Sequence, residues 1–255
     1  MMLRLLVISV LVWNVSVTEK WVYAAETDTP LPTYPWPHSG LFGTIDKSAA
    51  QRGLQVYEQV CKACHGLTSL SFRHLGGIGF TDEQIKAFAA TYTFSDTLDE
   101  QGQITQRSGK SSDFFPNPYR NDVEARLANN GVLPPDLSLI VAARNGGEDY
   151  ITALLTGYQD PPEEFTLAEG QYYNRYFPGH QLAMPQLLFD DAIEYTDGTR
   201  ATVLQQAKDV ATFLVFASDI HHDWRKQLGV RVLLFLIIFA GLMFATQRKL
   251  WSEIK

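Results

Sequence analysis

Cysteine is scarce in this 255-residue chain, which has only two, Cys61 and Cys64, separated by two residues. If both bind one cofactor, no thiol is left for a disulfide, so a disulfide-stabilised scaffold is excluded. An apolar content of 45% is enough to bury a core in a chain of this length. Folding must therefore depend on packing and on whatever the cysteines hold.

Positive charge is scarce in the middle of the chain. Between Glu26 and Asp223 we count 26 acidic and 13 basic residues, a net charge of −13 within a total of −7. The compensating basic residues lie at the two ends. This excludes nucleic acid as a natural partner, because binding phosphates needs the opposite sign, and it favours a basic protein partner.

Long hydrophobic runs are confined to the two ends. Near the N-terminus Arg4 precedes an apolar run over residues 5–15, and residues 22–25 resemble a signal-peptidase cleavage site. We predict a secretory signal peptide over residues 1–24. An uncleaved anchor is the alternative, but the run is short for a span of roughly 20 residues. A mitochondrial transit peptide is disfavoured by the few arginines and by Glu19.

The second apolar run covers residues 232–245 near the C-terminus and reaches about 18 residues if Arg231 extends its charge to the interface. A buried core helix is the alternative, but the run is apolar on every side and has basic edges. Arg248, Lys249 and Lys255 follow it, so the positive-inside rule predicts a cytoplasmic tail. We predict a transmembrane anchor over 226–247, a short tail over 248–255, and an external domain over 25–225.

The external domain is predicted to be mainly α with long loops. Residues 27–43 are rich in proline and aromatics, which indicates an extended segment on the surface. No convincing alternation of apolar and polar residues predicts a strand, and no internal repeat is visible. Apolar spacing predicts helices from residue 47 to the cysteines and over 81–91, 122–129, 136–143, 147–155 and 201–224, the last of which can continue into the anchor.

The two cysteines belong to the motif Cys61-Lys62-Ala63-Cys64-His65, a C-x-x-C-H haem-attachment signature. Two thiols one helical turn apart suit addition to the two vinyl groups of one haem, and His65 supplies an axial ligand to the iron. A redox dithiol is the alternative, but that motif needs no adjacent histidine and begins a helix in a βαβ pattern. We therefore predict one covalently bound haem c.

The sixth iron ligand is predicted by elimination. Of four methionines, Met1 and Met2 belong to the signal segment and Met243 lies in the anchor, which leaves Met184. Thioether ligation raises the haem potential, which suits an electron carrier. The alternatives are that Met184 only fills the core, or that a histidine is the ligand. His180 is the main rival, and His38 and His74 are more remote ones.

Several long segments resemble the cytochrome c1 family, the c-type haem subunits of ubiquinol–cytochrome c reductase (bc1) complexes. The resemblance covers nearly the whole mature chain and includes the terminal anchor. The matching segments are CKACHGLTSLSFRHL (61–75), FFPNPYRNDVEARLANNGVLPPDLSLIVAARNGGEDYITALLTGY (114–158), YYNRYFPGHQLAMP (172–185) and DGTRATVLQQAKDVATFL (197–214). Segments this long and in this order are far more specific than C-x-x-C-H alone.

The resemblance implies a class I-like cytochrome c domain whose haem relays single electrons from a Rieske iron–sulfur protein to a soluble cytochrome c. It implies a dimeric complex with cytochrome b. The signal peptide and the positive-inside orientation predict a bacterial inner membrane with the haem domain in the periplasm. Arg126 is expected to meet a haem propionate. Pro134, in the segment 133–138, is expected to line the His65 side, where a proline carbonyl would accept from the imidazole. Gln186 departs from the family, which commonly has a proline there, so the Met184 loop is less stiff.

Two other functions fit the motif less well. A haem peroxidase needs an open coordination site and usually a second haem, and a gas-binding haem sensor needs a weak or absent sixth ligand. The chain has one C-x-x-C-H motif, and Met184 can close the iron site. No catalytic site of its own is expected. The acidic pairs at 163–164 and 190–191 are interpreted as a solvated face that could also steer a basic partner.

Overall fold

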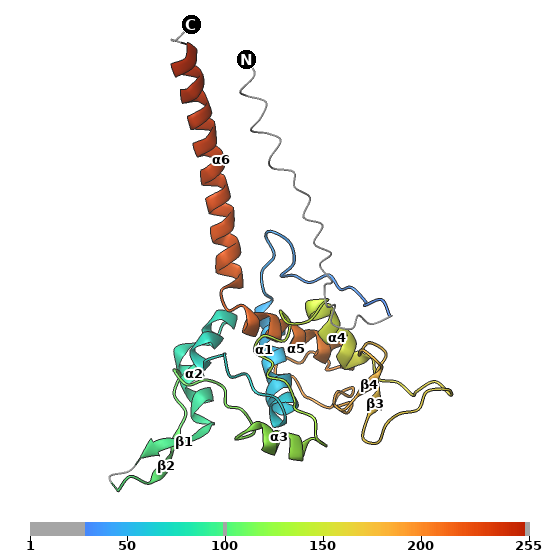
Figure 1. Ribbon diagram of the computed structural model, residues 1–255. Helices are drawn as coiled ribbons and strands as arrows, with labels where there is room; N and C mark the ends of the chain where they lie inside the picture. Colours follow the sequence, from blue (N-terminus) through green and yellow to red (C-terminus); the bar gives the residue numbers. More distant parts are fainter. Residues whose placement is uncertain (1–28, 99–100, 253–255) are drawn as a thin grey trace, which may run out of the picture.

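Helices and long loops account for most of the chain in a computed structural model that describes residues 29–98 and 101–252 (Figure 1). The prediction of a mainly α fold with one apolar C-terminal helix is confirmed. The predicted signal peptide lies outside the described residues. The segment 29–46, which precedes the first helix, runs over the surface as predicted, with only turns and bends in it.

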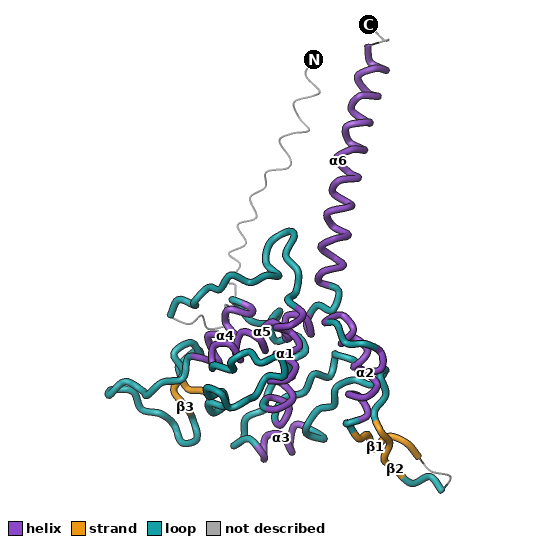
Figure 2. The backbone as a smooth tube through the Cα atoms, turned by 180° about the vertical axis from the view of Figure 1, so that it is seen from behind, coloured by secondary structure: helices purple, strands orange, loops and turns teal. Residues whose placement is uncertain are grey.

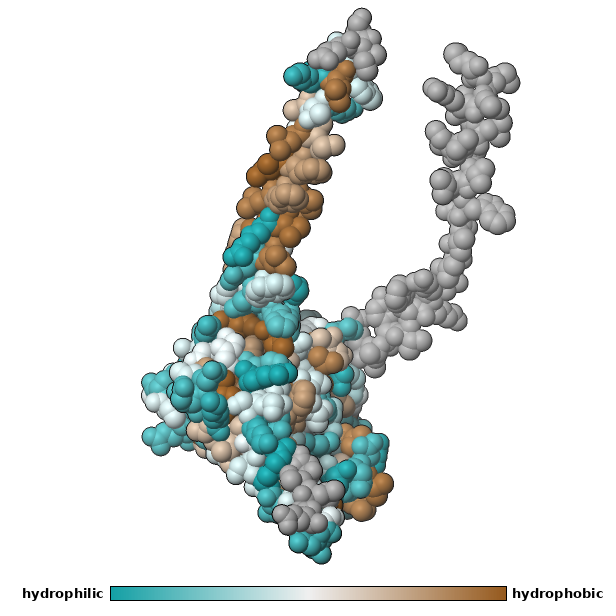
Figure 3. All heavy atoms as spheres, turned by 90° about the vertical axis from the view of Figure 1, so that its left-hand side faces the viewer, coloured by the Kyte–Doolittle hydropathy of each residue, from teal (hydrophilic) through white to brown (hydrophobic). Residues whose placement is uncertain are grey.

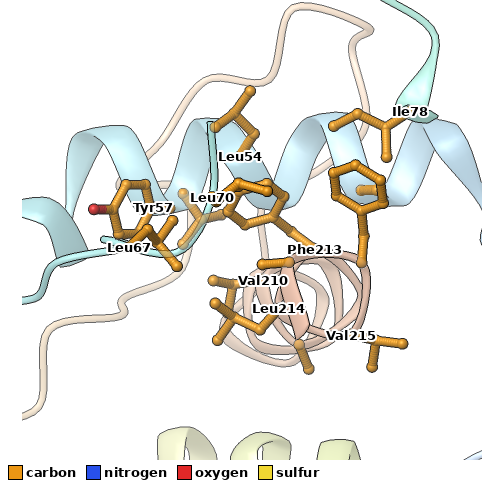
Figure 4. Packing of buried hydrophobic residues seen from close by; sticks show 14 of the residues in the cluster. Leu54, Tyr57, Leu67, Leu70, Ile78, Val210, Phe213, Leu214 and Val215 are labelled. Carbon is orange, nitrogen blue, oxygen red and sulfur yellow. The ribbon is translucent and has the colours of Figure 1, made fainter. Parts of the chain in front are cut away.

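The core forms where α1 (Lys47–Gln59) crosses α5 (Val203–Ser218). Leu54 and Tyr57 of α1 face Val210 and Phe213 of α5, and Figure 4 shows α5 almost end-on beneath α1. The crossing is close because Gly53 has no side chain: a Cβ there would lie 2.0 Å from a backbone oxygen of α5. The helix α4 (Gly147–Thr156) also packs against α5, which is buried over most of its length.

Local capping explains where several helices begin. Asp46 accepts hydrogen bonds from the first amides of α1, and Thr81 forms a capping box with Gln84 at the start of α2 (Asp82–Ala90). The side chain of Asn121 caps α3 (Asp122–Ala128) by accepting from the Glu124 amide. The predicted helices at 81–91, 122–129 and 147–155 are confirmed within a residue or two.

Short 3₁₀ helices and two small hairpins complete the domain. The 3₁₀ helices are η1 (Cys61–Ala63) and η2 (Phe72–Ile78). One antiparallel pair is β1 (Thr93–Leu98) with β2 (Ile104–Ser108), and the other is β3 (Tyr172–Tyr173) with β4 (Gln181–Leu182). The β1–β2 hairpin extends from the end of the domain opposite α6 (Figure 1, Figure 2). The expectation of no strands was therefore wrong at these two places.

Two predicted helices differ in the structure. Residues 137–143 form consecutive turns, with one helical bond from Ala143 N to Leu139 O (2.9 Å), and no helix. The long helix predicted over 201–224 ends at Ser218, because Asp219 takes a non-helical conformation (φ −144°, ψ 78°). A new helix, α6 (His222–Ser252), starts three residues later.

The helix α6 leaves the domain as a single rod of 31 residues with its apolar stretch fully exposed (Figure 1). Within the described ranges, it is the one helix long and apolar enough to cross a membrane. At 1.5 Å per residue it is about 46 Å long, against a hydrocarbon core of about 30 Å. Figure 3 shows its apolar zone between two more hydrophilic ends, as expected of a span with polar flanks.

Candidate haem-attachment site

The cysteine motif sits on a tight turn that directly follows α1. The amides of Cys64 and His65 both donate to the carbonyl of Cys61, at 3.1 and 3.0 Å. This bonding stacks the two thiols one turn apart, with the imidazole on the next residue. Both cysteines are half-buried, and neither forms a disulfide. The two thiols therefore lie one turn apart, as the spacing of the motif predicts.

The orientation of the His65 ring is fixed by a hydrogen bond to the segment that contains Pro135. Its Nδ1 lies 2.7 Å from the carbonyl oxygen of Pro135, and the backbone carbonyl of His65 accepts from the Tyr57 hydroxyl at 3.0 Å. An N–H at Nδ1 that donates to Pro135 leaves Nε2 as the basic, metal-binding nitrogen. The expected proline carbonyl is thus that of Pro135, the residue after Pro134.

The segment that contains Pro135 is fastened to the residues after the motif. Asp136 Oδ2 accepts from the amide and the hydroxyl of Thr68, both at 2.9 Å. The amide of Leu137 donates to the Gly66 carbonyl at 2.9 Å, and the amide of Ser69 donates to the Ser138 hydroxyl at 3.0 Å. Burial raises the pKa of Asp136, but the hydrogen bonds that its carboxylate accepts from Ser138 and Thr68 outweigh this and lower it. The carboxylate therefore keeps the proline carbonyl in place.

Burial changes the proton affinity of the motif itself. It raises the pKa of the Cys61 thiol to about 12, and it lowers the pKa of His65 despite the hydrogen bond to Pro135. A redox dithiol depends on a cysteine whose pKa is lowered. The environment of Cys61 raises its pKa, which disfavours a redox dithiol. The lowered pKa of His65 favours the neutral imidazole, which is the form that binds iron.

Arg126 lies on α3, which approaches the motif through Tyr119. The Tyr119 hydroxyl accepts from Asn129 Nδ2 at 2.9 Å and interacts with the Cys64 thiol. The Arg126 side chain is exposed and donates to the Gly131 carbonyl at 3.1 Å. Sequence reasoning missed Tyr119 and Asn129, since neither belongs to a spacing pattern.

Met184 belongs to a different part of the domain, the loop after β4. It is half-buried, and its backbone carbonyl accepts from the Tyr158 hydroxyl at 2.9 Å. Tyr158 follows α4, so this loop is fixed to the α4–α5 side of the core. Gln186, at the position of the missing proline, donates to the Leu188 carbonyl at 3.2 Å.

The rival histidines each have structural partners. His180 Nδ1 lies 3.1 Å from the Asn174 carbonyl, and its ring stacks on Tyr173. His74 Nδ1 accepts from the Ser71 amide at 3.2 Å in the capping box of η2. His38 is 4% exposed, with Nε2 3.2 Å from Glu148. Each ring thus has a role that requires no iron.

The two acidic pairs differ in what they do. Asp190 accepts from the Val203 amide at the start of α5 (2.7 Å), and Asp191 pairs with Arg200 at 3.0 Å. Glu163 and Glu164 are exposed on the loop before β3. The interpretation of a solvated acidic face therefore suits the glutamates better than the aspartates.

These residues fit a haem held by two thioethers. The motif offers two thiols on one turn and an imidazole whose Nδ1 is already engaged. Exposed apolar side chains stand on the segments that flank the motif: Leu127 on α3 is 83% exposed, and Val132 and Leu139 are 42% and 55% exposed. An apolar macrocycle beside the motif would cover such groups. The fold and the site together define a class of protein: a helical, haem-binding domain attached to an apolar C-terminal helix.

Comparison with known proteins gives the family. Residues 36–254 match the Cytochrome C1 family. The chain is 47% identical over 248 residues to the cytochrome b-c1 complex catalytic subunit, mitochondrial, of Candida albicans, covering 97% of this chain and 86% of that one. It is 47% identical over 241 residues to the cytochrome c1, heme protein, mitochondrial, of Saccharomyces cerevisiae, covering 94% and 78%. It is 43% identical over 249 residues to the cytochrome b/c1 of Bradyrhizobium diazoefficiens, covering 89% and 36%. This chain belongs to the cytochrome c1 family.

Proposed function

We propose that this chain is the haem-carrying electron-transfer subunit of a bc1 complex. It accepts one electron from a Rieske iron–sulfur protein and passes it to a soluble cytochrome c, and it binds cytochrome b in a dimeric assembly. Family membership supports the complex, and the observation that carries the site is the 2.7 Å contact between His65 Nδ1 and Pro135. When bound, the haem supplies one-electron redox chemistry at its iron.

Cys61 and Cys64 would hold the haem covalently, and His65 Nε2 would ligate the iron. The hydrogen bond from Nδ1 to Pro135 fixes the ring orientation and raises its basicity as a ligand. Because Asp136 ties this segment to Thr68, the imidazole is oriented before any partner binds. Met184 would give the second axial ligand, a thioether that favours the reduced iron.

Two further residues complete the proposed site. Arg126, exposed on α3, would pair with a haem propionate, and Pro134 would line the His65 side next to Pro135. Electron relay needs no general base, nucleophile or substrate cavity in this subunit. We therefore propose no catalytic site of its own.

The proposed location is a bacterial inner membrane, with residues 25–225 in the periplasm, an anchor over 226–247 and a cytoplasmic tail over 248–255. Arg248 and Lys249 at the far end of α6 favour this orientation. The strongly acidic domain suits a basic soluble acceptor, and the exposed Glu163 and Glu164 are available to steer it.

Met184→Leu tests the proposal. Leucine has nearly the same volume, so the packing loss should stay below about 1.5 kcal/mol. The haem should remain attached, because attachment depends on the two cysteines. Losing the thioether should lower the potential, and each 59 mV in a one-electron couple is about 1.4 kcal/mol. Reduction by the iron–sulfur partner should then stall, as followed by redox titration and quinol-driven reduction of cytochrome c.

Met243→Leu is the matched control, since Met243 lies on the apolar helix α6 and should leave the potential unchanged. If Met184→Leu kept the wild-type potential, Met184 would not be the ligand and His180 would become the leading candidate.

Mass spectrometry of the mature chain tests attachment separately. We expect the added mass of one haem on the peptide that contains Cys61 and Cys64, and an N-terminus near residue 25. A chain that kept Met1 would contradict the processing, whereas a haem that extraction removed would contradict the thioethers.

A further inference from the structure

A closed loop stands beside the base of α6. Residues 37–44 form it, with the Thr44 amide donating to the Pro37 carbonyl at 3.1 Å. Glycine is required at two places in the loop. Gly40 has a positive φ of 71°, and a Cβ on Gly43 would lie 2.0 Å from the Ser39 oxygen. The loop thus has a defined conformation and not an arbitrary one.

The base of the loop is fixed to both α4 and α6. Trp36 Nε1 donates to Asp149 at 2.7 Å, and the buried His38 lies 3.2 Å from Glu148, so α4 holds the first half. Lys226 of α6 donates to the Gly40 carbonyl at 2.7 Å and also to the carbonyl of His38. The tip therefore keeps its position relative to the start of α6.

The tip of the loop is apolar and exposed. Leu41 is 56% exposed and Phe42 77% exposed, and Trp224 in the first turn of α6 is 62% exposed. In Figure 1 and Figure 2 the segment before α1 rises from the domain on the side from which α6 leaves. Single exposed apolar residues are ordinary on a protein surface. Two adjacent ones, on a fixed loop at the end of the domain from which α6 leaves, form an apolar patch that calls for a partner.

The contact with Lys226 gives the depth of this surface. Lys226 is three residues, about 4.5 Å along the helix, before Gly229, the residue at which the apolar run starts when Arg231 extends its charge to the interface. The headgroup zone on each side of a bilayer is roughly 5–8 Å thick. A tip one or two residues beyond Gly40 therefore reaches the headgroup zone, where aromatic side chains are favoured.

We propose that Leu41 and Phe42 insert into the outer leaflet of the bilayer next to α6, as a second membrane contact of the domain. One helix alone would leave the domain and α6 free to tilt and rotate together in the membrane. A second contact fixed to α4 and α6 sets the orientation of the haem domain above the membrane. The proposal rests on α6 crossing the membrane, which is part of the proposed function, and it names lipid, not a protein subunit, as the occupant.

Site-directed spin labelling of the full, haem-loaded chain in lipid nanodiscs tests this proposal. Because the haem occupies both native cysteines, labels attach only at introduced ones. Phe42→Cys carries the test label, and Ile237→Cys reports on α6. The control is Ile104→Cys, which is 71% exposed on β2 at the opposite end of the domain. Collision with lipid-soluble oxygen is compared with collision with a water-soluble nickel complex.

We expect the labels at positions 42 and 237 to collide more with oxygen and less with nickel than the label at 104. If the label at 237 reads as lipid and that at 42 matches the control, the loop proposal is wrong while the anchor stands. If 237 reads as water, the anchor itself is wrong. If position 42 loses nickel collisions only in the complex with cytochrome b, the loop docks on protein and the lipid proposal is refuted.

Discussion

Removing the Arg52 guanidinium should leave a carboxylate unpaired inside the domain. Arg52 on α1 donates through Nε and Nη2 to the two oxygens of Asp209 on α5, at 2.9 and 3.0 Å. Its Nη1 also reaches Asp197 at 2.8 Å, and Gln205 donates to Asp209 at 3.0 Å. The Asp209 side chain is only 1% exposed. The pair joins the helix before the cysteine motif to the helix that leads to the anchor.

The expected cost of Arg52→Met follows from this burial. Methionine keeps much of the side-chain stem but removes all three donors. Breaking a buried ion pair on one side costs about 3–5 kcal/mol, which is a large part of the roughly 5–15 kcal/mol that stabilises a typical domain. Replacing both partners, in Arg52→Met with Asp209→Leu, should recover most of the loss, because no buried charge is left unpaired.

Denaturant unfolding of the haem-loaded chain in detergent, followed by far-ultraviolet circular dichroism, measures these differences. The matched control is Arg200→Met, which breaks the exposed pair with Asp191 and should cost no more than about 1 kcal/mol. Equal shifts for Arg52→Met and Arg200→Met would refute the argument from burial. If the double variant were no more stable than Arg52→Met, the loss of stability would come from losing the geometry of the pair and not from the unpaired charge of Asp209.

Two further predictions concern the anchor and pH. A chain cut before Gly229 should release a soluble, haem-containing domain, measured by sedimentation after the partners are stripped; a fragment that stays with the membrane would count against α6 as the main anchor. The hydrogen bond from His38 lowers the pKa of Glu148 from its ordinary value of 4.5. A lowered pKa stabilises the fold above pH 4.5 and the effect is lost as pH falls below it. Glu148→Gln should therefore unfold more easily at pH 7, and its deficit should shrink as pH falls below 4.5; a constant deficit would contradict this.

Helices whose ends are set by neighbouring residues were predictable from the sequence. Thr81 with Gln84 and Asn121 with Glu124 are local pairs, so the pattern and the cap agree. Asp136 also looks like a helix cap in the sequence. Its Oδ1 accepts from the nearby Ser138 amide, but its Oδ2 accepts from the distant Thr68 amide. Only turns follow, with a single helical bond from the Ala143 amide to the Leu139 carbonyl, so a local cap at Asp136 was not enough to predict a helix.

The strands and the helix break could not be predicted for other reasons. In β2 the residues alternate between exposed and half-buried and none is buried, so this strand needs no strong apolar alternation. The break at Asp219 has no glycine or proline to mark it. It is stabilised by Arg225 Nε, which donates to the Asp219 carboxylate at 3.2 Å, a contact that an uninterrupted helix would not require.

The candidate site also has a part that depends on neighbouring residues and a part that depends on distant ones. The proposed attachment is local, because the two thiols and the imidazole occupy one turn, so one short motif is enough to predict it. The proposed ligation is not local. Pro135 reaches His65 across 70 residues, through a segment that Asp136 fastens, and the Met184 loop is fixed through Tyr158 near α4. The choice between Pro134 and Pro135 was beyond the sequence because adjacent residues point their carbonyls differently, and only the fold decides which one meets the ring. Substitutions in the motif should therefore abolish attachment, whereas substitutions at Asp136 or Tyr158 should leave the haem attached and change its ligation.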